Sequence, residues 1–316
     1  MSLVLEGLVK RFGTVEALRG LSLEIPRGTV FGLIGPNGAG KTTTMRAILR
    51  IVEPDAGRIA WDGQPVERLP LSTFGYLPEE RGLYPKMRVR EELRFFGELH
   101  GMLRRSIDEA VERFAELLRM HDILDRKVED LSKGNAQKVQ FAAACIHRPP
   151  VLILDEPFGG LDPVNVSLFK RAVGRLRSYG TTILFSSHRM EHVEELCDGV
   201  CLISGGRVVI QGRVDQVRRA TGRRVLRLAW EQEDEGARAL LDSLVRRGWQ
   251  VSQGANGVWQ ISWTDGQVET TEEARDLLAS ATSVGLVRLW ELTYPSLEDV
   301  YVETVGAGAL EEDAVA

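Results

Sequence analysis

Short runs of consecutive apolar residues alternate with stretches of helical periodicity along the first two thirds of the chain. Residues 30–34 and 151–154 are apolar over the length of a strand, which predicts buried strands of a parallel sheet. A helical pattern follows at residues 163–179, and another apolar strand at residues 181–185. Strands that alternate with helices in this way predict an α/β core.

The segments around the first of these strands have a different pattern. Residues 3–9 and 21–25 place apolar side chains at every second position, residues 26–28 form a turn, and residues 57–63 have the composition of another short strand. A period of two is typical of half-buried strands. We therefore expect a small antiparallel layer beside the parallel core.

Between about residues 82 and 148 the pattern is helical. Residues 89–100 carry Leu93, Phe96 and Leu99 at helical spacing, and residues 107–120 repeat this arrangement. No strand pattern interrupts the region. It is therefore predicted to be a helical subdomain inserted into the α/β core.

The last third of the chain reads as a second domain. Its predicted strands are residues 225–230, 249–252, 258–263 and 286–292, and its predicted helices are residues 237–247 and 271–281. The resulting order β-α-β-β-α-β predicts a small α+β domain of the ferredoxin-like type. A final helix is expected at residues 296–304, followed by a polar, disordered tail at residues 306–316.

These patterns predict two domains, residues 1–215 and residues 221–305. The second domain carries three tryptophans, Trp249, Trp259 and Trp263, around a hairpin signal. They form either a ligand-binding surface or a small core, and alternating aromatic residues on a hairpin more often form a core. The domain itself serves either dimerisation or regulation, or only structural support.

Composition narrows the function classes. The chain has 316 residues, of which 43% are hydrophobic and 27% charged, which is typical of a soluble globular protein. A net charge of −5 gives no basis for nucleic-acid binding. The three cysteines lack metal-ligand spacing, and neither a signal peptide nor a run of about 18 apolar residues is present. Any membrane role must therefore come from a partner.

A glycine-rich segment follows the first buried strand and opens into a helical pattern. Residues 35–42 match the phosphate-loop pattern G-x-x-x-x-G-K-[ST] in the strand–loop–helix context that this motif requires. Its backbone N–H groups and the helix N-terminus suit a phosphate chain, Lys41 suits the β- and γ-phosphates, and Thr42 suits Mg²⁺. An ordinary glycine-rich turn is the alternative, and the flanking pattern favours nucleotide binding. The residues expected to bind nucleotide here are Gly35, Pro36, Asn37, Gly38, Ala39, Gly40, Lys41, Thr42 and Thr43.

Acidic and histidine residues follow two of the predicted core strands. Asp155 and Glu156 end one strand, and His188 follows the next. In a phosphate-loop ATPase, an Asp at this position holds Mg²⁺ through its water shell and the adjacent Glu polarises the attacking water. Parallel strands bring His188 to the same edge, where it would sense the γ-phosphate or position water. Turn or helix-cap carboxylates and a structural histidine are the alternatives.

A second candidate anion site lies at residues 131–137, before another helical run. Ser132 and the backbone N–H groups of Lys133 and Gly134 would form it at a helix N-terminus. The helical subdomain separates this segment from the phosphate loop, so two chains would have to complete each other's sites. On spacing alone, the segment is equally consistent with a simple helix N-cap.

Together, these motifs resemble the ATP-binding subunits of ABC transporters, over residues 1 to about 215. The resemblance identifies residues 35–43 as Walker A, residues 151–156 as Walker B, residues 160–162 as the D-loop and His188 as the switch histidine. It implies ATP and Mg²⁺ as cofactors, with Lys41, Glu156 and His188 as catalytic residues.

The same resemblance assigns further binding residues. Phe12 matches the aromatic position that stacks on adenine, and residues 131–137 match the signature segment. Ser132 and Gly134 would then bind the γ-phosphate of ATP held by the opposite subunit. This implies a homodimer or heterodimer of ATPase domains.

Two segments depart from the commonest family pattern. The family's commonest signature is Leu-Ser-Gly-Gly-Gln, whereas this chain has Lys133 at the first Gly and Asn135 at the Gln. Glu79 replaces the glutamine of the glutamine loop. Glu79 could approach Mg²⁺ and its waters as a charged ligand. These variants resemble the NatA-like, sodium-exporter-type subunits.

The resemblance implies an ATP-hydrolysing subunit on the cytoplasmic face of a membrane. It would drive transport, of the efflux type, through a separate integral-membrane subunit that residues 79–102 contact. A soluble ABC-type ATPase acting on ribosomes or DNA is an alternative, but such proteins carry two cassettes or a long coiled-coil insertion. A nucleotide-binding regulator without hydrolysis is a third, and the presence of Lys41, Asp155, Glu156 and His188 argues against it.

Overall fold

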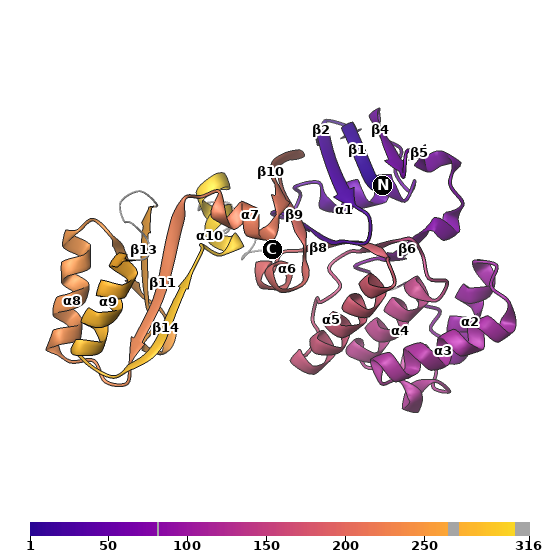
Figure 1. Cartoon of the computed structure of the whole chain (residues 1–316). Helices are drawn as coiled ribbons and strands as arrows, with labels where there is room; N and C mark the ends of the chain where they lie inside the picture. The colour runs from indigo at the N-terminus through magenta and orange to yellow at the C-terminus, as the bar shows by residue number, and fades with distance from the viewer. Residues whose placement is uncertain (81, 265–271, 307–316) are drawn as a thin grey trace. The chain divides into compact units, whose positions relative to one another are not determined.

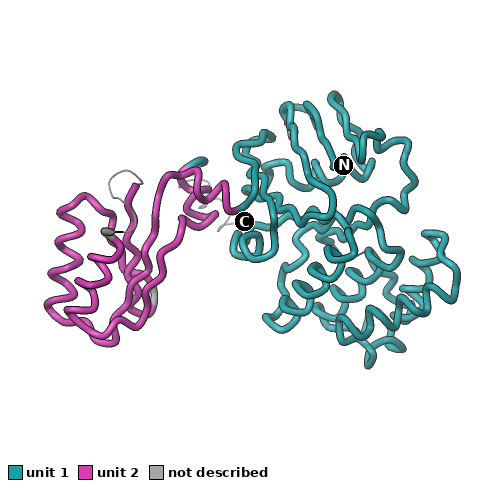
Figure 2. Tube along the Cα trace, in the orientation of Figure 1, with its two compact units in different colours: residues 1–214, 304–316 teal, residues 215–303 magenta. Residues whose placement is uncertain are grey.

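The computed structural model describes residues 1–80, 82–264 and 272–306 (Figure 1). The chain divides into two compact units (Figure 2): unit 1 is Met1–Val214 with the chain end from Thr304, and unit 2 is Asp215–Glu303. The tail expected to be disordered lies outside the described residues, except for Gly306, as does Arg81 of the glutamine-loop segment. No helix within the described ranges is long and apolar enough to cross a membrane.

A six-stranded sheet with the order β10-β9-β3-β8-β7-β6 forms the centre of unit 1. Its strands are β3 (Val30–Ile34), β6 (Phe74–Leu77), β7 (Val151–Leu154), β8 (Thr182–Ser187), β9 (Gly199–Ser204) and β10 (Arg207–Arg213). All neighbours pair in parallel except β9 and β10, which confirms the predicted α/β core. Every residue of β3, β7 and β8 is buried, as expected for strands covered on both faces.

Three strands of this sheet, β6, β9 and β10, were not assigned from the sequence. β6 has only four residues and includes Gly75, and β10 alternates between exposed and half-buried positions without a strongly apolar face. β6 pairs with β7, β9 pairs with β3, and β10 pairs with β9, and this pairing completes the sheet. Strand propensity depends on such neighbours.

A second, antiparallel sheet has the order β2-β1-β4-β5. It consists of β1 (Ser2–Phe12), β2 (Val15–Pro26), β4 (Ala56–Trp61) and β5 (Gln64–Pro65). One hydrophobic core joins it to the parallel sheet, because leucines of β1 and β2 cluster with Met45 and Ile48 of α1 (Lys41–Ile48) and with Ile153 and Leu184. The predicted antiparallel layer is therefore confirmed, with longer strands than expected.

Helices account for most of the region between β6 and β7, as predicted. They are α2 (Val89–Leu99), α3 (Arg104–Leu118) and α4 (Lys133–Cys145), with short 3₁₀ turns η3 (His121–Ile123) and η4 (Val128–Asp130). α3 begins three residues before the predicted start at Ile107. The prediction missed these residues because they are exposed and carry no apolar signal. The further helices of unit 1 are α5 (Pro163–Ser178) and α6 (Met190–Leu196), with 3₁₀ turns η1 (Val66–Arg68) and η2 (Leu71–Thr73).

Unit 2 contains a four-stranded antiparallel sheet with the order β12-β13-β11-β14. Its elements are β11 (Arg223–Trp230), α8 (Glu235–Arg246), β12 (Gln250–Gln253), η5 (Ala255–Gly257), β13 (Trp259–Thr264), α9 (Glu272–Ser283) and β14 (Val287–Thr293). The short α7 (Val214–Arg219) precedes them and α10 (Leu297–Val305) follows. Trp249 and Trp263 stack with ring centroids 4.6 Å apart inside the core of this unit, so the interpretation of the tryptophans as core residues is confirmed.

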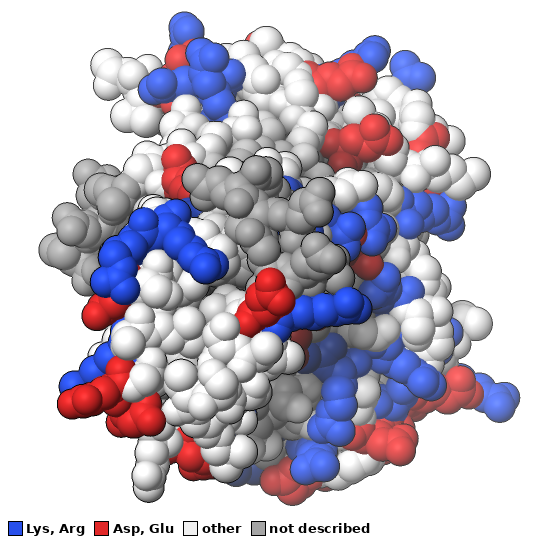
Figure 3. Space-filling model, turned by 60° about the vertical axis from the view of Figure 1, so that its left-hand side comes forward, with Lys and Arg blue, Asp and Glu red and all other residues white. Residues whose placement is uncertain are grey.

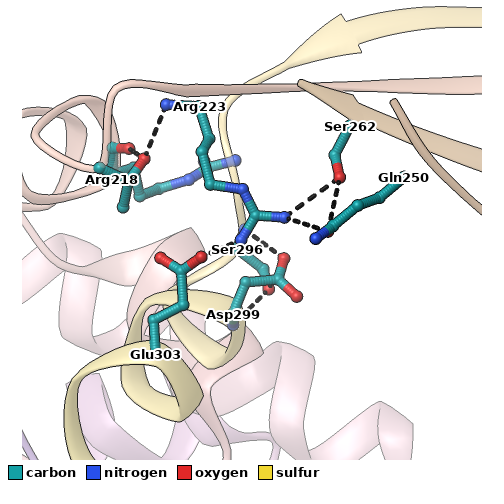
Figure 4. A network of polar contacts seen from close by, with 8 residues as sticks. Arg218, Arg223, Gln250, Ser262, Ser296, Asp299 and Glu303 are labelled. Atoms are coloured by element: carbon teal, nitrogen blue, oxygen red, sulfur yellow. Dashed lines mark hydrogen bonds and ion pairs between the residues drawn. The ribbon is translucent and has the colours of Figure 1, made fainter. Parts of the chain in front are cut away.

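A polar network fixes α10 to the sheet of unit 2 (Figure 4). The guanidinium of Arg223 donates to the side chains of Gln250 and Ser262, at 3.1 Å each, and pairs with Glu303 of α10. Ser296 and Asp299 close the N-terminus of the same helix through reciprocal hydrogen bonds. Side-chain hydrogen bonds and an ion pair therefore attach α10 to the sheet face opposite the apolar core.

Candidate functional site

A cavity of about 760 Å³ lies at the carboxyl ends of β3, β7 and β8. In parallel sheets this edge is where ligands bind, because the loops after neighbouring strands converge there. The residues that line it are Val15, Ala17, Asn37, Gly38, Ala39, Gly40, Lys41, Thr42, Thr43, Glu79, Lys133, Gln137, Asp155, Glu156, Gly159, Gly160 and His188.

The glycines of the phosphate loop hold conformations that other residues rarely adopt. Gly35 and Gly40 have φ values of 156° and 105°, and a Cβ atom on Gly35 would lie 2.2 Å from the carbonyl oxygen of Ile203. On Gly40, a Cβ would lie 2.7 Å from the carbonyl oxygen of Ala17. The loop therefore depends on glycine for both torsion and space.

The loop ends at the N-terminus of α1. Gly40 is the N-cap residue and makes no side-chain capping bond, so the N–H groups of the first turn are not capped by a side chain. These groups and the helix dipole favour an anion at this end. Lys41 lies buried along the loop, where its ammonium donates to the carbonyl oxygens of Gly35 at 2.7 Å and Pro36 at 3.0 Å.

Thr42 and Asp155 come together from different elements. The Thr42 hydroxyl donates to Oδ1 of Asp155 at 3.4 Å, and the Ser186 hydroxyl donates to the same oxygen at 2.7 Å. Asp155 is 2% exposed. A hydroxyl and a carboxylate oxygen are hard ligands that suit Mg²⁺, which usually keeps several waters. Glu79 lines the same cavity and adds a second carboxylate.

Glu156 and His188 form a pair across the ends of β7 and β8. Nδ1 of His188 lies 3.0 Å from Oε2 of Glu156. Glu156 has a positive φ of 46°, unusual for a residue with a side chain, and its N–H donates to the Ser186 hydroxyl at 2.9 Å. Ser186 thus contacts both acids and holds the turn that directs the Glu156 carboxylate into the cavity.

Ser186 was not among the site residues predicted from the sequence. The signal in the sequence was its place near the end of a predicted buried strand, two residues before His188. Its contacts with Asp155 and Glu156 could not be predicted, because they depend on the parallel pairing of β7 with β8.

The predicted signature segment begins α4. The Ser132 hydroxyl accepts a hydrogen bond from the N–H of Asn135 at 3.4 Å, so Ser132 is the N-cap residue. Ser132 and Gly134 do not line the cavity within the described residues, whereas Lys133 and Gln137 do. Lys133 packs closely on Gly160, since a Cβ there would lie 2.3 Å from its ammonium.

Phe12, expected to stack on adenine, ends β1 and is 49% exposed. It does not line the cavity as the structure describes it, while Val15 and Ala17 of β2 do. The ammonium of Lys10 lies 5.5 Å from the centre of its ring. The exposed ring is adjacent in sequence to the cavity-lining strand, which leaves its predicted role open to test.

Glu92 is a buried acid that the helical pattern did not single out. It is 0% exposed, and its Oε1 accepts the N–H of Tyr84 at 3.0 Å. Burial raises the pKa of its carboxyl group, which the hydrogen bond from Tyr84 partly opposes. This contact ties the loop before α2 to the helix.

Comparisons with known proteins agree with this site. A family model described as "ABC transporter" matches residues 18–159. The chain is 43% identical over 309 residues to the ABC transporter ATP-binding protein YhaQ of Bacillus subtilis, covering 96% of this chain and 99% of that protein. It is 40% identical to NatA of the same organism, over 64% of this chain and 84% of NatA.

Two further similarities extend the comparison. A Nod factor export ATP-binding protein of Burkholderia lata is 39% identical, over 64% of this chain and 68% of that protein. A solved ATP-binding subunit of an ABC transporter superposes with a TM-score of 0.66 at 30% identity, over 70% of this chain and 94% of the other. The chain belongs to the ATP-binding proteins of ABC transporters, and it is an ATPase subunit that powers transport.

Proposed function

We propose that Glu156 activates the water that attacks the γ-phosphate of ATP, and that His188 positions that water and contacts the γ-phosphate. The observation that carries this proposal is the 3.0 Å contact between the two side chains, inside the cavity that the phosphate loop lines. A carboxylate fixed by a neighbouring hydrogen bond is suited to act as a general base. Lys41 binds the β- and γ-phosphates by turning from the loop carbonyls toward them.

Thr42 and Asp155 are the residues that would hold Mg²⁺. The close approach of the Thr42 hydroxyl to the buried Asp155 carboxylate supports this assignment. The metal, when bound, neutralises charge on the phosphates. Glu79, which lines the same cavity, would approach the metal or its waters, and Ser186 keeps Asp155 oriented toward Thr42.

Two copies of the ATPase domain, identical or different, complete each other's sites. Ser132 and Gly134 lie at the N-terminus of α4 outside the cavity of their own chain, which suits a role toward ATP held by the opposite subunit. Phe12 stacks on the adenine. The N-cap role of Ser132 is compatible with this role, because its hydroxyl accepts only a long hydrogen bond of 3.4 Å from Asn135.

An integral-membrane subunit docks on the segment from residue 79 to residue 102. Tyr84 and Leu99 are 49% and 66% exposed there, and Tyr84 packs edge-on against Phe95. Exposed apolar side chains that lie together mark interaction surfaces. The protein therefore works at the cytoplasmic face of a membrane and does not bind nucleic acid. It drives efflux as a NatA-like, sodium-exporter-type subunit. Similarity to NatA and to a Nod factor export protein supports the outward direction of transport.

The ATPase domain comprises residues 1–215, with its helical subdomain at about 82–148, and residues 221–305 form the accessory domain. The β-α-β-β-α-β order and the strand order β12-β13-β11-β14 support a ferredoxin-like fold for the accessory domain. It serves dimerisation or regulation of the transporter. Deleting residues 221–316 should then lower dimer formation in the presence of ATP.

Steady-state ATPase measurement tests the central assignment. Glu156→Gln should keep ATP binding, measured by equilibrium dialysis, but lower turnover by about 10²–10⁴-fold, the usual contribution of a general base. Glu156→Asp, which keeps the charge on a shorter side chain, serves as the matched variant and should retain more turnover. Unchanged turnover in Glu156→Gln would remove Glu156 as the base.

A further inference from the structure

A second hollow in unit 1 is lined mainly by arginines. It has a volume of about 560 Å³ and lies between the C-terminal halves of α3 and α5, two helices that pack against each other (Figure 1). Arg113 and Arg119 line it from the side of α3, and Arg171 and Arg175 from α5. We call it the arginine pocket. Such a volume is typical of sites for small molecules.

The charge of the arginine pocket is not balanced by acids. Glu116 is the one carboxylate among its lining residues. Within the described part of the chain, no carboxylate lies within ion-pair distance of Arg113, Arg119 or Arg171. By contrast, over much of the face drawn in Figure 3, basic and acidic side chains lie beside one another, as on ordinary protein surfaces.

One arginine of the pocket is also partly withdrawn from water, whereas Arg119, Arg171 and Arg175 are exposed. Arg113 is half-buried, and burial lowers the pKa of its guanidinium, with repulsion from Arg148 as the second cause. A cation in this position lacks a counter-charge that an anion would supply. Tyr179 adds an aromatic ring and a hydroxyl, which Arg175 contacts through a hydrogen bond of 2.8 Å and through its ring face.

Stabilisation of a helix end explains only part of this arrangement. Basic residues in the last turn of α5, such as Arg175, complement the helix dipole. Arg171 stands a turn earlier, and Arg113 belongs to another helix, so neither is explained in this way. α5 carries four basic residues and no acidic one along its 16 residues.

We propose that the arginine pocket binds a small phosphorylated anion of the di- or triphosphate class. Guanidinium groups present planar pairs of N–H donors that match phosphate oxygens, and several phosphates in a row would contact arginines from both helices at once. The pocket is separate from the ATP cavity. α5 begins beside the cavity-lining Gly160, and the pocket-lining residues lie toward its other end, along a helix roughly 24 Å long by its rise per residue.

Counting bound pyrophosphate tests the proposal. Equilibrium dialysis of the full chain with labelled pyrophosphate, in buffer with a chelator, should find two sites per chain: the phosphate loop and the arginine pocket. The double variant Arg113→Ala with Arg171→Ala should retain one site. The altered pocket should bind pyrophosphate about tenfold or more weakly than the wild-type pocket, because charge-assisted hydrogen bonds are lost, so it should no longer count as a second site.

Matched variants separate a built site from general attraction. Arg104→Ala removes an exposed arginine of α3 outside the pocket and should leave two sites. Replacing Arg113 and Arg171 by Lys keeps the charge but removes the planar fork, and should weaken pocket binding. One site in the wild-type protein, two sites in the double alanine variant, or full binding by the double lysine variant would each overturn the proposal.

Competition identifies the source of the phosphates. In the Lys41→Ala protein, ADP and unlabelled pyrophosphate compete with labelled pyrophosphate for the arginine pocket. A nucleotide ligand would be supported if ADP displaces the label more strongly than pyrophosphate does, and if adding Tyr179→Ala removes this advantage of ADP. Equal displacement would support inorganic phosphates. Arginine-dependent binding to phosphatidylserine vesicles, with only one pyrophosphate site in the wild-type protein, would overturn the proposal in favour of a membrane surface. ATP binding by the double alanine variant reports separately on the phosphate loop.

Discussion

The ATP cavity and the arginine pocket are two candidate phosphate sites built in different ways. In the ATP cavity, the backbone conformation forms most of the site, through glycines in restricted conformations, a helix N-terminus and a turn at Glu156 with positive φ. In the arginine pocket, long side chains from two helices supply the contacts, and the helices themselves are regular. A site fixed by backbone tolerates little change in sequence, whereas one fixed by side chains is more easily altered without loss of fold.

Substitution in the phosphate loop should have the largest effect on stability. In Gly35→Ala, the new Cβ would meet the Ile203 carbonyl oxygen at 2.2 Å, so the free energy of unfolding should fall by about 3 kcal/mol or more, as strain and displacement combine. Urea unfolding measures it. Gly38→Ala is the control, because Gly38 has a φ of 75° with open space around it and should cost only about 1–2 kcal/mol. Equal losses would contradict the close-packing explanation.

Ser186→Ala tests how the backbone turn is held. Loss of its hydroxyl leaves the N–H of Glu156 without its acceptor and removes the shorter of the two hydroxyl hydrogen bonds to Asp155, which should cost about 1–3 kcal/mol of stability. Turnover should fall as well, because both acids lose orientation. Ser187→Ala is the neighbouring control, since the Ser187 hydroxyl makes its hydrogen bonds, among the described residues, with the backbone of Arg189 and with neither acid. A normal turnover in Ser186→Ala would show that the strand ends alone position the acids.

The half-buried His147 contrasts with the arginines of the pocket as a group that loses its charge. Its ring stacks on His100 at 3.6 Å, and burial, together with repulsion from His100, lowers the pKa of His147 to about 4. The unfolded chain would take up this proton near the ordinary value of 6.5. The unfolded state therefore binds more protons between these values, and the free energy of unfolding should fall as the pH falls from 6.5 to 4.

His147→Gln should flatten this pH dependence, and urea unfolding at several pH values measures the slope. Replacing the exposed His121 by Gln is the control and should leave the slope as in the wild type. If both variants keep the wild-type slope, other groups account for the acid sensitivity.

Changes in the arginine pocket should have the smallest effect on stability. Arg113→Met keeps the length and apolar stem of the side chain, removes repulsion from Arg148, and should change the free energy of unfolding by only about 0.5 kcal/mol, in the stabilising direction. Urea unfolding in buffer without phosphate checks this. A large loss of stability would mean that Arg113 is a structural residue, and the contrast with the ATP cavity would fail.

The difference also explains what could be predicted from the sequence. The phosphate loop requires glycine at fixed positions, so residues 35–43 could be found by motif, and continuous apolar runs indicated β3, β7 and β8. The arginine pocket has no such pattern, because Arg113 and Arg171 are far apart in the sequence and each looks like an ordinary exposed helix residue. Glu92 was missed for the same reason, since its burial comes from packing.

Unit 2 contains both features that a local sequence pattern predicts and contacts that no local pattern predicts. Alternation along residues 225–230 and 258–263 indicated β11 and β13 and their aromatic core, because period two reflects burial of one sheet face. The Arg223 network on the open face could not be predicted, since it joins a strand, a hairpin and the last helix through polar side chains.

The sequence by itself determined the buried strands β3, β7 and β8, the phosphate loop and the acids that follow β7, because these depend on local periodicity and on backbone conformations that few residues allow. Only the tertiary structure decided that His188 meets Glu156, that Ser186 holds both acids, and that Lys133 packs on Gly160. These contacts depend on the register of parallel strands and on helix packing between distant segments, which no local pattern contains.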